Sequence, residues 1–422
     1  MKVTLVQPKY FNIWESIAFG YLGSYVKRYY KGKLDINYFQ AFFDDEKNII
    51  EESINSDIVA FSCTTPTFSH ALGLARSLKR ENSKIHIVFG GWHVSAVPEE
   101  ALEHPEIDQI VIGEGEESFL DILNGNRNRV LRGRAVSDLD YLPFPDRELI
   151  RNHREIDLCY QIAKERITSF QSNRGCPFRC VFCAERVITG KFHRKDNPIR
   201  SRSPNNLLDE VVSVSERYKL DKFKFVDSTW NVSTERVISF CREKISRGFD
   251  LPFECNIHAA LTNQEMFEWM ARANCHQINV GVESGSPAIM AKNRKGISCD
   301  KVEKVFKWAR GVGIERRAFF QIGMIDETDE DIEMTEEFAE RIQPDVFGVT
   351  ITCPYPGTDY YDREKFADVN WAKTDEYING FWSTKYLTNQ ELKNWQQRLC
   401  NRFKDKMAWH NKLLINEETI EV

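Results

Sequence analysis

The sequence lacks the features that would place it across a membrane or along a nucleic acid. No stretch approaches the ~18 consecutive apolar residues that a membrane-spanning helix requires, and the first apolar run stops at Pro8. Positive charge is not in excess, because 57 Lys and Arg face 63 Asp and Glu, for a formal net charge of −6. We therefore expect a cytoplasmic protein with no membrane span and no nucleic-acid partner.

Cysteine, by contrast, is plentiful, with eleven residues in a chain of 422. Thiols stay reduced in the cytoplasm, so cysteines there indicate metal binding, catalysis or core packing more often than disulfides. Eight stand singly, and each is expected to pack as a small apolar side chain. These eight are Cys63, Cys159, Cys241, Cys255, Cys275, Cys299, Cys353 and Cys400. The other three lie within eight residues of one another.

The first part of the chain alternates short apolar strands with amphipathic helices. Strands are predicted at 3–6, 36–39, 58–62, 85–89 and 109–112. This alternation is typical of a doubly wound parallel sheet of the Rossmann-like kind, which we assign to residues 1–125. Ligands bind such sheets at the carboxyl ends of the strands, where small and glycine-rich loops follow. The candidate ligand residues in these loops are Ser62, Thr64, Thr65, Gly90, Gly91, Gly113, Glu114 and Gly115.

A second alternating series follows a polar and proline-containing segment, residues 126–165, which we interpret as a linker. Strands are predicted at 167–171, 222–226, 253–257, 277–282, 317–322 and 347–352. Six β/α units fit a partial (β/α)6 barrel of the TIM type over residues 166–360, with its chemistry at the carboxyl ends of the strands. Residues 361–422 form an aromatic-rich tail with helical periodicity.

The strongest local motif follows the first strand of this second series. Cys176, Cys180 and Cys183 form a C-x3-C-x2-C spacing that can bring three thiolates to one metal centre. A structural zinc site requires four ligands, and His193, ten residues further on, has no partner at finger-like spacing. Three thiolates instead suit an iron–sulfur cubane with one iron left open.

This motif, with the aromatic Phe182 before its third cysteine, resembles the radical S-adenosylmethionine (SAM) superfamily. The resemblance implies that the three cysteines hold a 4Fe–4S cluster, that SAM chelates the open iron, and that an electron from the cluster cleaves SAM to a 5′-deoxyadenosyl radical. It also implies an external low-potential electron donor and a small-molecule substrate. The family's looser strand-end segments map onto the SAM contacts Phe182, Asp227, Ser228, Glu283, Ser284 and Gly323.

The N-terminal domain resembles the B12-binding domain that precedes the barrel in one subgroup of this superfamily. Gly90 and Gly91 match the glycine pair of the cobalamin fingerprint, and Ser62 stands where its serine is expected. The same alignment places Ile17 at the position of the histidine that ligates cobalt from below, and isoleucine cannot ligate a metal. The resemblance implies bound cobalamin, while an inherited domain that no longer binds it stays open. His93, beside the glycine pair, is expected at the loop surface.

Two reactions remain open. In the first, the 5′-deoxyadenosyl radical abstracts hydrogen from a substrate carbon that then takes a methyl group from methylcobalamin. In the second, the same abstraction starts a dehydration, cyclisation, epimerisation or oxidation without cobalt. The second requires a proton or electron donor at the barrel mouth, for which strand-end position gives the candidates His258, Cys255 and Tyr355. A non-catalytic iron–sulfur electron carrier would leave the ordered strand-end segments unexplained.

Overall fold

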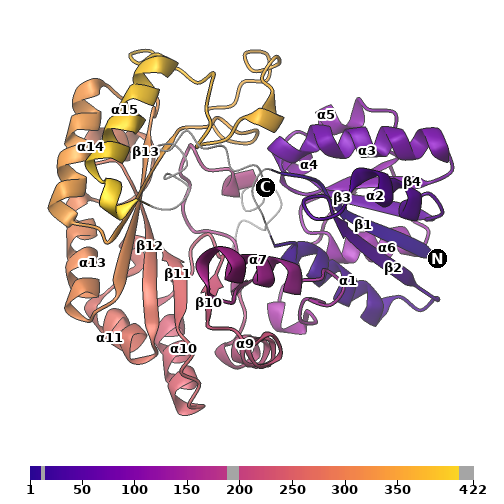
Figure 1. Cartoon of the computed structure of the whole chain (residues 1–422), viewed down its shortest axis with the longest axis horizontal. Helices are drawn as coiled ribbons and strands as arrows, with labels where there is room; N and C mark the ends of the chain where they lie inside the picture. Colours follow the sequence, from indigo (N-terminus) through magenta and orange to yellow (C-terminus); the bar gives the residue numbers. More distant parts are fainter. Residues whose placement is uncertain (11–14, 188–198, 408–422) are drawn as a thin grey trace.

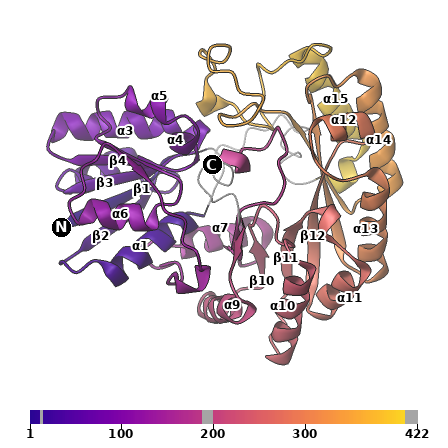
Figure 2. The ribbon, with the colours of Figure 1, turned by 180° about the vertical axis from the view of Figure 1, so that it is seen from behind.

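The computed structural model describes residues 1–10, 15–187 and 199–407. Two parallel β-sheets lie at opposite ends of the long axis, with helix α7 (His153–Ala163) between them (Figure 1). The view from behind shows the same arrangement (Figure 2). The predicted fold class, a doubly wound sheet followed by a partial barrel and a helical tail, is confirmed.

The N-terminal sheet has six strands in the order β2-β1-β3-β4-β5-β6, and all neighbours pair in parallel. The strands are β1 (Lys2–Gln7), β2 (Asp35–Gln40), β3 (Ile58–Ser62), β4 (His86–Gly90), β5 (Gln109–Ile112) and β6 (Val130–Arg132). The helices are α1 (Ile17–Tyr29), α2 (Glu46–Ser53), α3 (Phe68–Glu81), α4 (Trp92–Ala96), α5 (Pro98–Leu102) and α6 (Glu116–Leu123). Two separate apolar clusters cover the two faces, one with α1 and α6 and the other with α2 to α5, because a parallel sheet must bury both faces.

The second sheet is also parallel and open, in the order β14-β13-β12-β11-β10-β7. Its strands are β7 (Ile167–Phe170), β10 (Lys222–Phe225), β11 (Phe253–Ile257), β12 (Cys275–Glu283), β13 (Glu315–Ile322) and β14 (Val346–Ile351). The helices are α9 (Pro204–Tyr218), α10 (Thr234–Ser246), α11 (Gln264–Arg272), α12 (Pro287–Lys292), α13 (Cys299–Gly311) and α14 (Asp329–Ile342). Strand order therefore follows chain order, as in part of a TIM barrel.

Local sequence explains where these helices begin. Ser203 accepts a hydrogen bond from the Asn206 amide, and Pro204 takes the first helical position of α9. Thr328 and Asp331 form a capping box at the start of α14. These caps satisfy amides that have no partner inside the helix, and they fix the strand-to-helix loops that carry the site.

The tail packs on the last barrel strand. Helix α15 (Asn389–Arg402) lies against β14, and the Phe403 ring stacks on Phe347 with 4.3 Å between ring centroids. Strand β6, the short 3-10 helix η2 (Leu139–Tyr141) and α7 all fall within the range predicted as a linker. In the described parts of the chain, no helix combines the length and apolar character needed to cross a membrane.

Candidate functional site

The cysteine motif stands on a loop whose entry is fixed by a buried carboxylate. Asp227, directly after β10, accepts hydrogen bonds from the Ser172 and Asn173 amides, each at 2.8 Å, and from the Ser172 hydroxyl at 2.6 Å. Burial raises the pKa of Asp227. The residue predicted to contact SAM therefore holds the backbone that leads into the loop.

The three motif thiols converge on one region. The Cys176 sulfur lies 3.2 Å from the Thr229 hydroxyl, and the Cys183 amide donates to the Cys180 carbonyl at 3.2 Å. Burial raises the pKa of Cys180 to about 11 and that of Cys183 to about 12, and the negative charges of the neighbouring thiolates add to both shifts. Among the described residues, no group of three or more His, Cys, Asp or Glu side chains is arranged to hold a single metal ion. The three thiols are therefore near one another without forming a single-metal site, and three cysteine ligands suit an iron–sulfur cubane better than a four-ligand zinc ion.

A buried lysine that the sequence analysis missed faces these thiols. Lys295 pairs with Glu283, with 2.6 Å from Nζ to Oε1. Burial alone would lower the pKa of Lys295, but Glu283 and then Cys180 raise it. Glu283 adopts a positive φ of 68°, at the end of β12. Glu283, which was predicted to contact SAM, therefore forms an ion pair beside the cysteine loop. No local pattern in the sequence indicates that Lys295 is its partner.

His258 lies on the same side of the loop. Its ring stacks on Phe178 with 3.4 Å between centroids, and its Nε2 lies 3.1 Å from the Lys295 carbonyl, to which the neutral ring donates. Burial, followed by the charge of Lys295, lowers the pKa of His258 to about 3. The imidazole is therefore neutral near pH 7 and supports the loop by packing.

Three further predicted SAM residues of the barrel, Ser284, Gly323 and Phe182, lie in local packing or hydrogen-bond contacts. The Ser284 and Thr335 hydroxyls meet at 3.1 Å and tie the end of β12 to α14. The Gly323 amide donates to Glu327 at 2.5 Å, and burial raises the pKa of Glu327 to about 8. Phe182 packs against the barrel core.

The two other predicted donors differ in setting. Cys255 is fully buried in the barrel core beside Cys275, as a packing residue. The Tyr355 hydroxyl donates to Glu376 at 2.7 Å, and burial raises the pKa of that carboxyl. The Tyr10 hydroxyl, from the loop after β1, donates to Asp375 at 2.9 Å. Tyr355 therefore belongs to a polar group that includes the N-terminal domain.

A cavity of about 540 Å³ lies between the two halves of the chain. Six of the predicted cobalamin residues line it, namely Ser62, Gly90, Gly91, Gly113, Glu114 and Gly115. From the barrel side it is lined by Gly175 of the cysteine loop, Asp227 and Ser228, and the Ser228 hydroxyl donates to the Glu185 carboxylate at 2.7 Å. The loops of the first domain and the entry of the cysteine loop thus share one space.

Two predicted loop residues are not among those that line the cavity. Thr64 forms a capping box with Thr67, and the Thr65 hydroxyl lies 3.2 Å from Nδ1 of His93. The prediction of a surface histidine was wrong, because His93 is 2% exposed and its Nε2 lies 3.5 Å from Glu100.

The backbone at Gly91, on the cavity wall, requires glycine. Gly91 has a φ of +94°, and a Cβ there would lie 2.6 Å from the Cys63 amide nitrogen. The Cys63 amide donates to the Gly90 carbonyl at 2.9 Å, so the loop after β3 is bound to the loop after β4. Ile17 lines the same cavity, where the sequence placed it.

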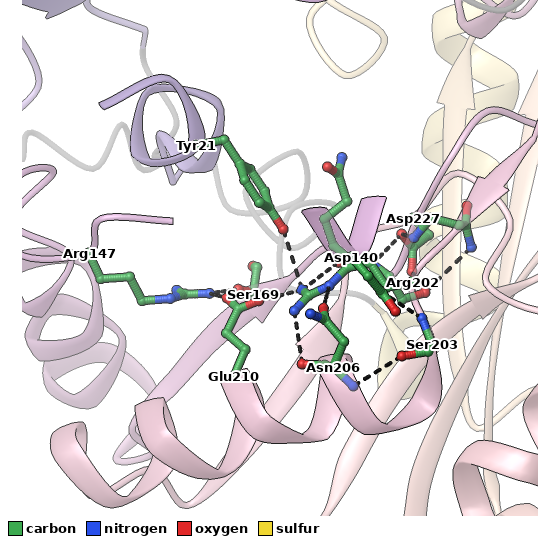
Figure 3. Close-up of polar contacts among 12 residues, drawn as sticks. Tyr21, Asp140, Arg147, Ser169, Arg202, Ser203, Asn206, Glu210 and Asp227 are labelled. Atoms are coloured by element: carbon green, nitrogen blue, oxygen red, sulfur yellow. Dashed lines mark hydrogen bonds and ion pairs between the residues drawn. The ribbon is translucent and has the colours of Figure 1, made fainter. Parts of the chain in front are cut away.

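A buried polar network surrounds Glu210 (Figure 3). Glu210, on α9, pairs with both Arg147 and Arg202. Arg202 also donates to the Gln171 carbonyl at 3.2 Å and contacts the Tyr21 hydroxyl at 3.4 Å. Since Tyr21 lies on α1 and lines the cavity, the network connects the first domain to the strand that leads into the cysteine loop.

Comparisons with known proteins agree with this arrangement. The family model of the radical SAM superfamily matches residues 170–339, and that of the B12 binding domain matches residues 10–123. An uncharacterized methyltransferase of Pyrococcus horikoshii is 28% identical over 373 residues, covering 83% of this chain and 79% of that protein. The anaerobic magnesium-protoporphyrin IX monomethyl ester cyclase of Rubrivivax gelatinosus is 25% identical over 400 residues, covering 86% and 70%.

A similar fold occurs in a radical SAM methyltransferase of Kitasatospora setae, solved with cobalamin and a 4Fe–4S cluster bound. It matches with a TM-score of 0.68 at 17% identity, covering 85% of this chain and 76% of that chain. The chain therefore carries a B12-binding domain followed by a radical SAM domain, in the predicted order.

Proposed function

We propose that this chain is a cobalamin-dependent radical SAM enzyme that methylates a carbon of a small-molecule substrate. The observation that carries the proposal is the shared cavity of about 540 Å³. Gly90 and Gly91 line it from the first domain, and Asp227 and Ser228 line it from the barrel. Methyl transfer to a substrate radical requires the two cofactors to be held side by side, because reacting atoms must approach within about 3–3.5 Å.

Cys176, Cys180 and Cys183 are proposed as the ligands of the 4Fe–4S cluster. When bound, the cluster and SAM supply the 5′-deoxyadenosyl radical, and cobalamin supplies the methyl group. The chain's own residues place and shield these groups. Cys180 is buried and Cys183 is half-buried, so the protein limits the access of water to the proposed centre.

For SAM, we propose that Ser228 makes a direct contact and that Asp227 acts through the backbone of Ser172 and Asn173. Ser228 lines the cavity and is half of a pair with Glu185, whereas both Asp227 oxygens already accept hydrogen bonds. The other four predicted SAM residues are proposed to shape the barrel mouth by packing and ion pairing. They are Phe182, Glu283, Ser284 and Gly323.

For cobalamin, the proposed contacts are the six loop residues that line the cavity. Gly91 is the position among them that we expect to be most sensitive to substitution, because a side chain there would clash with the Cys63 backbone. Ile17 lines the cavity at the position where the B12-domain resemblance places a histidine, and its apolar side chain would supply no ligand to the metal of cobalamin.

A second outcome is radical dehydration, cyclisation, epimerisation or oxidation without cobalamin. Among these reactions, the similarity to the anaerobic magnesium-protoporphyrin IX monomethyl ester cyclase of Rubrivivax gelatinosus favours cyclisation. In that reaction Tyr355 is the proposed donor, because its hydroxyl lies in the polar group shared with Tyr10, Asp375 and Glu376. His258 and Cys255 are poorer donors, since one is a neutral packing residue and the other is in the core.

The test is SAM cleavage by the anaerobic, cluster-reconstituted protein under a low-potential reductant, with and without cobalamin. We expect 5′-deoxyadenosine in both cases, and a small-molecule product that has gained a methyl group only when cobalamin is present. Candidate substrates are supplied as cell-extract metabolite fractions, and products are read by mass spectrometry with deuterated-methyl SAM. Products that form equally without cobalamin and carry no labelled methyl would refute methylation and support the second outcome.

A further inference from the structure

The cysteine loop has a narrow neck formed by two very short strands. β8 (Asn173–Arg174) pairs antiparallel with β9 (Arg200–Ser201), with Arg174 opposite Arg200. The chain between these arginines carries all three motif cysteines, and its residues 188–198, including His193, lie outside the described residues. A two-residue pairing provides few backbone hydrogen bonds, so other contacts must hold the neck closed.

The carboxylate of Glu114, in the first domain, forms ion pairs with both strands of this neck. Glu114 accepts from Nη1 of Arg174 at 2.9 Å and from Nη1 of Arg200 at 3.1 Å, and it also pairs with Nη2 of Arg200. Arg174 has a second carboxylate partner in Glu116, at 2.6 Å. The side chains of Glu114, Arg174 and Arg200 are 8%, 14% and 7% exposed, so water screens these pairs weakly.

Glu114 is itself held in a rigid place on the cavity wall. A Cβ at Gly133 would overlap the Glu114 carbonyl oxygen, so the segment after β6 packs directly on this loop. The Gly113 amide donates to the Ser95 hydroxyl at 2.9 Å, and the Val136 amide donates to the Glu114 carboxylate at 3.3 Å. The loop that lines the cavity therefore cannot move far without moving the neck.

We propose that Glu114 is a positioning residue that fastens the neck of the cysteine loop to the cobalamin-binding loop and so sets the separation of the two cofactors. Its carboxylate neutralises the facing guanidinium groups of Arg174 and Arg200. Without it, Arg174 keeps only Glu116 and Arg200 loses its carboxylate among the described contacts, so excess positive charge stays buried at the two-residue pairing and opens the neck. The inference rests on the proposed function, because it concerns the spacing of that site's cofactors.

Two variants and a matched control test it. Glu114→Gln removes the negative charge. Glu114→Asp keeps the charge but has a shorter side chain, so its carboxylate cannot contact Arg174 and Arg200 at the same time. Glu117→Gln is the control, since Glu117 stands at the start of α6 and pairs only with the exposed Arg134 among the contacts described. The full chain is loaded with cluster and cobalamin, both are reduced to their paramagnetic one-electron states, and pulsed electron paramagnetic resonance measures the magnetic coupling between them.

We expect the native chain and Glu117→Gln to give the same narrow distribution of separations, and both Glu114 variants to give a broader or longer one. An unchanged distribution in Glu114→Gln and Glu114→Asp would overturn the inference. A native chain that retains no cobalamin would instead refute the proposed function.

A second measurement tests the positioning role of Glu114 even if the native chain retains no cobalamin. Amide hydrogen exchange of the cluster-loaded chain should become about tenfold faster at residues 171–176 in Glu114→Gln, and stay unchanged in Glu117→Gln. Exchange at native rates in both Glu114 variants would overturn the inference whether or not cobalamin binds.

Discussion

Replacing Glu210 by Gln should destabilise the barrel and loosen the cysteine loop. Glu210 is 1% exposed and serves as the shared counter-charge of Arg147 and Arg202, which are 5% and 3% exposed (Figure 3). The variant keeps the shape of the side chain but removes the carboxylate with which both buried guanidinium groups form ion pairs.

The expected loss follows from what the two arginines retain. Arg147 still donates to Asn152 at 2.7 Å and to the Ser169 carbonyl at 2.8 Å, and Arg202 still donates to Asn206 at 2.7 Å. These neutral acceptors satisfy hydrogen bonds but do not balance charge. Breaking a buried ion pair from one side costs about 3–5 kcal/mol, so we expect a loss of about that size in the free energy of unfolding.

The assay is urea unfolding of the metal-free protein under anaerobic conditions, followed by far-ultraviolet circular dichroism. Asp209→Asn is the matched control, because the neighbouring Asp209 is 59% exposed and pairs with Arg247 at the surface. A surface pair contributes about 0–1 kcal/mol, so the control should change little. Equal effects of the two variants would refute the reasoning that burial makes the Glu210 charge important.

Three further predictions concern the site. Cys176→Ala should abolish the broad iron–sulfur absorbance and SAM cleavage. The control Cys159→Ala, on α7 and outside the motif, should keep both. SAM cleavage by Cys176→Ala would contradict the ligand assignment. Gly91→Val should weaken cobalamin retention at least about tenfold in equilibrium dialysis, because its Cβ meets the Cys63 backbone, whereas Gly73→Ala, whose Cβ meets nothing within 4 Å, should bind as the native chain does. His258→Phe should flatten the pH dependence of stability. The pKa of His258 is about 3 in the folded protein and ordinarily 6.5, so between these values only the unfolded state binds the proton. The free energy of unfolding of the native protein should therefore fall by about 1.4 kcal/mol per pH unit below 6.5. Unfolding midpoints between pH 6 and about pH 4 that fall equally in native and variant proteins would contradict this.

Much of the fold could be predicted because its signals are local. The strands of both sheets appear in the sequence as short apolar runs, and structure places a strand at each predicted range. β6 was missed because it has three residues in a stretch rich in Asn and Arg. The β8 and β9 pair was missed for a similar reason, since two residues carry no periodicity.

The site was predictable only in part, because much of it depends on contacts between distant residues. The cysteines and the glycine pair form compact motifs, but the partners of Glu114 lie 60 and 86 positions away, at Arg174 and Arg200. Thr64 was assigned to the cavity although its spacing from Thr67 allowed a capping box, a local signal that was overlooked. Lys295 carries no motif at all.

The central claim is that the cavity between the two halves binds cobalamin. The most direct measurement is the ultraviolet–visible spectrum of anaerobically purified, cluster-reconstituted protein that has been incubated with hydroxocobalamin and then desalted, with Gly91→Val carried through in parallel. The account predicts stoichiometric corrin absorbance in the native chain and its loss in the variant. A desalted native protein that shows only iron–sulfur absorbance, yet still cleaves SAM, would contradict the claim.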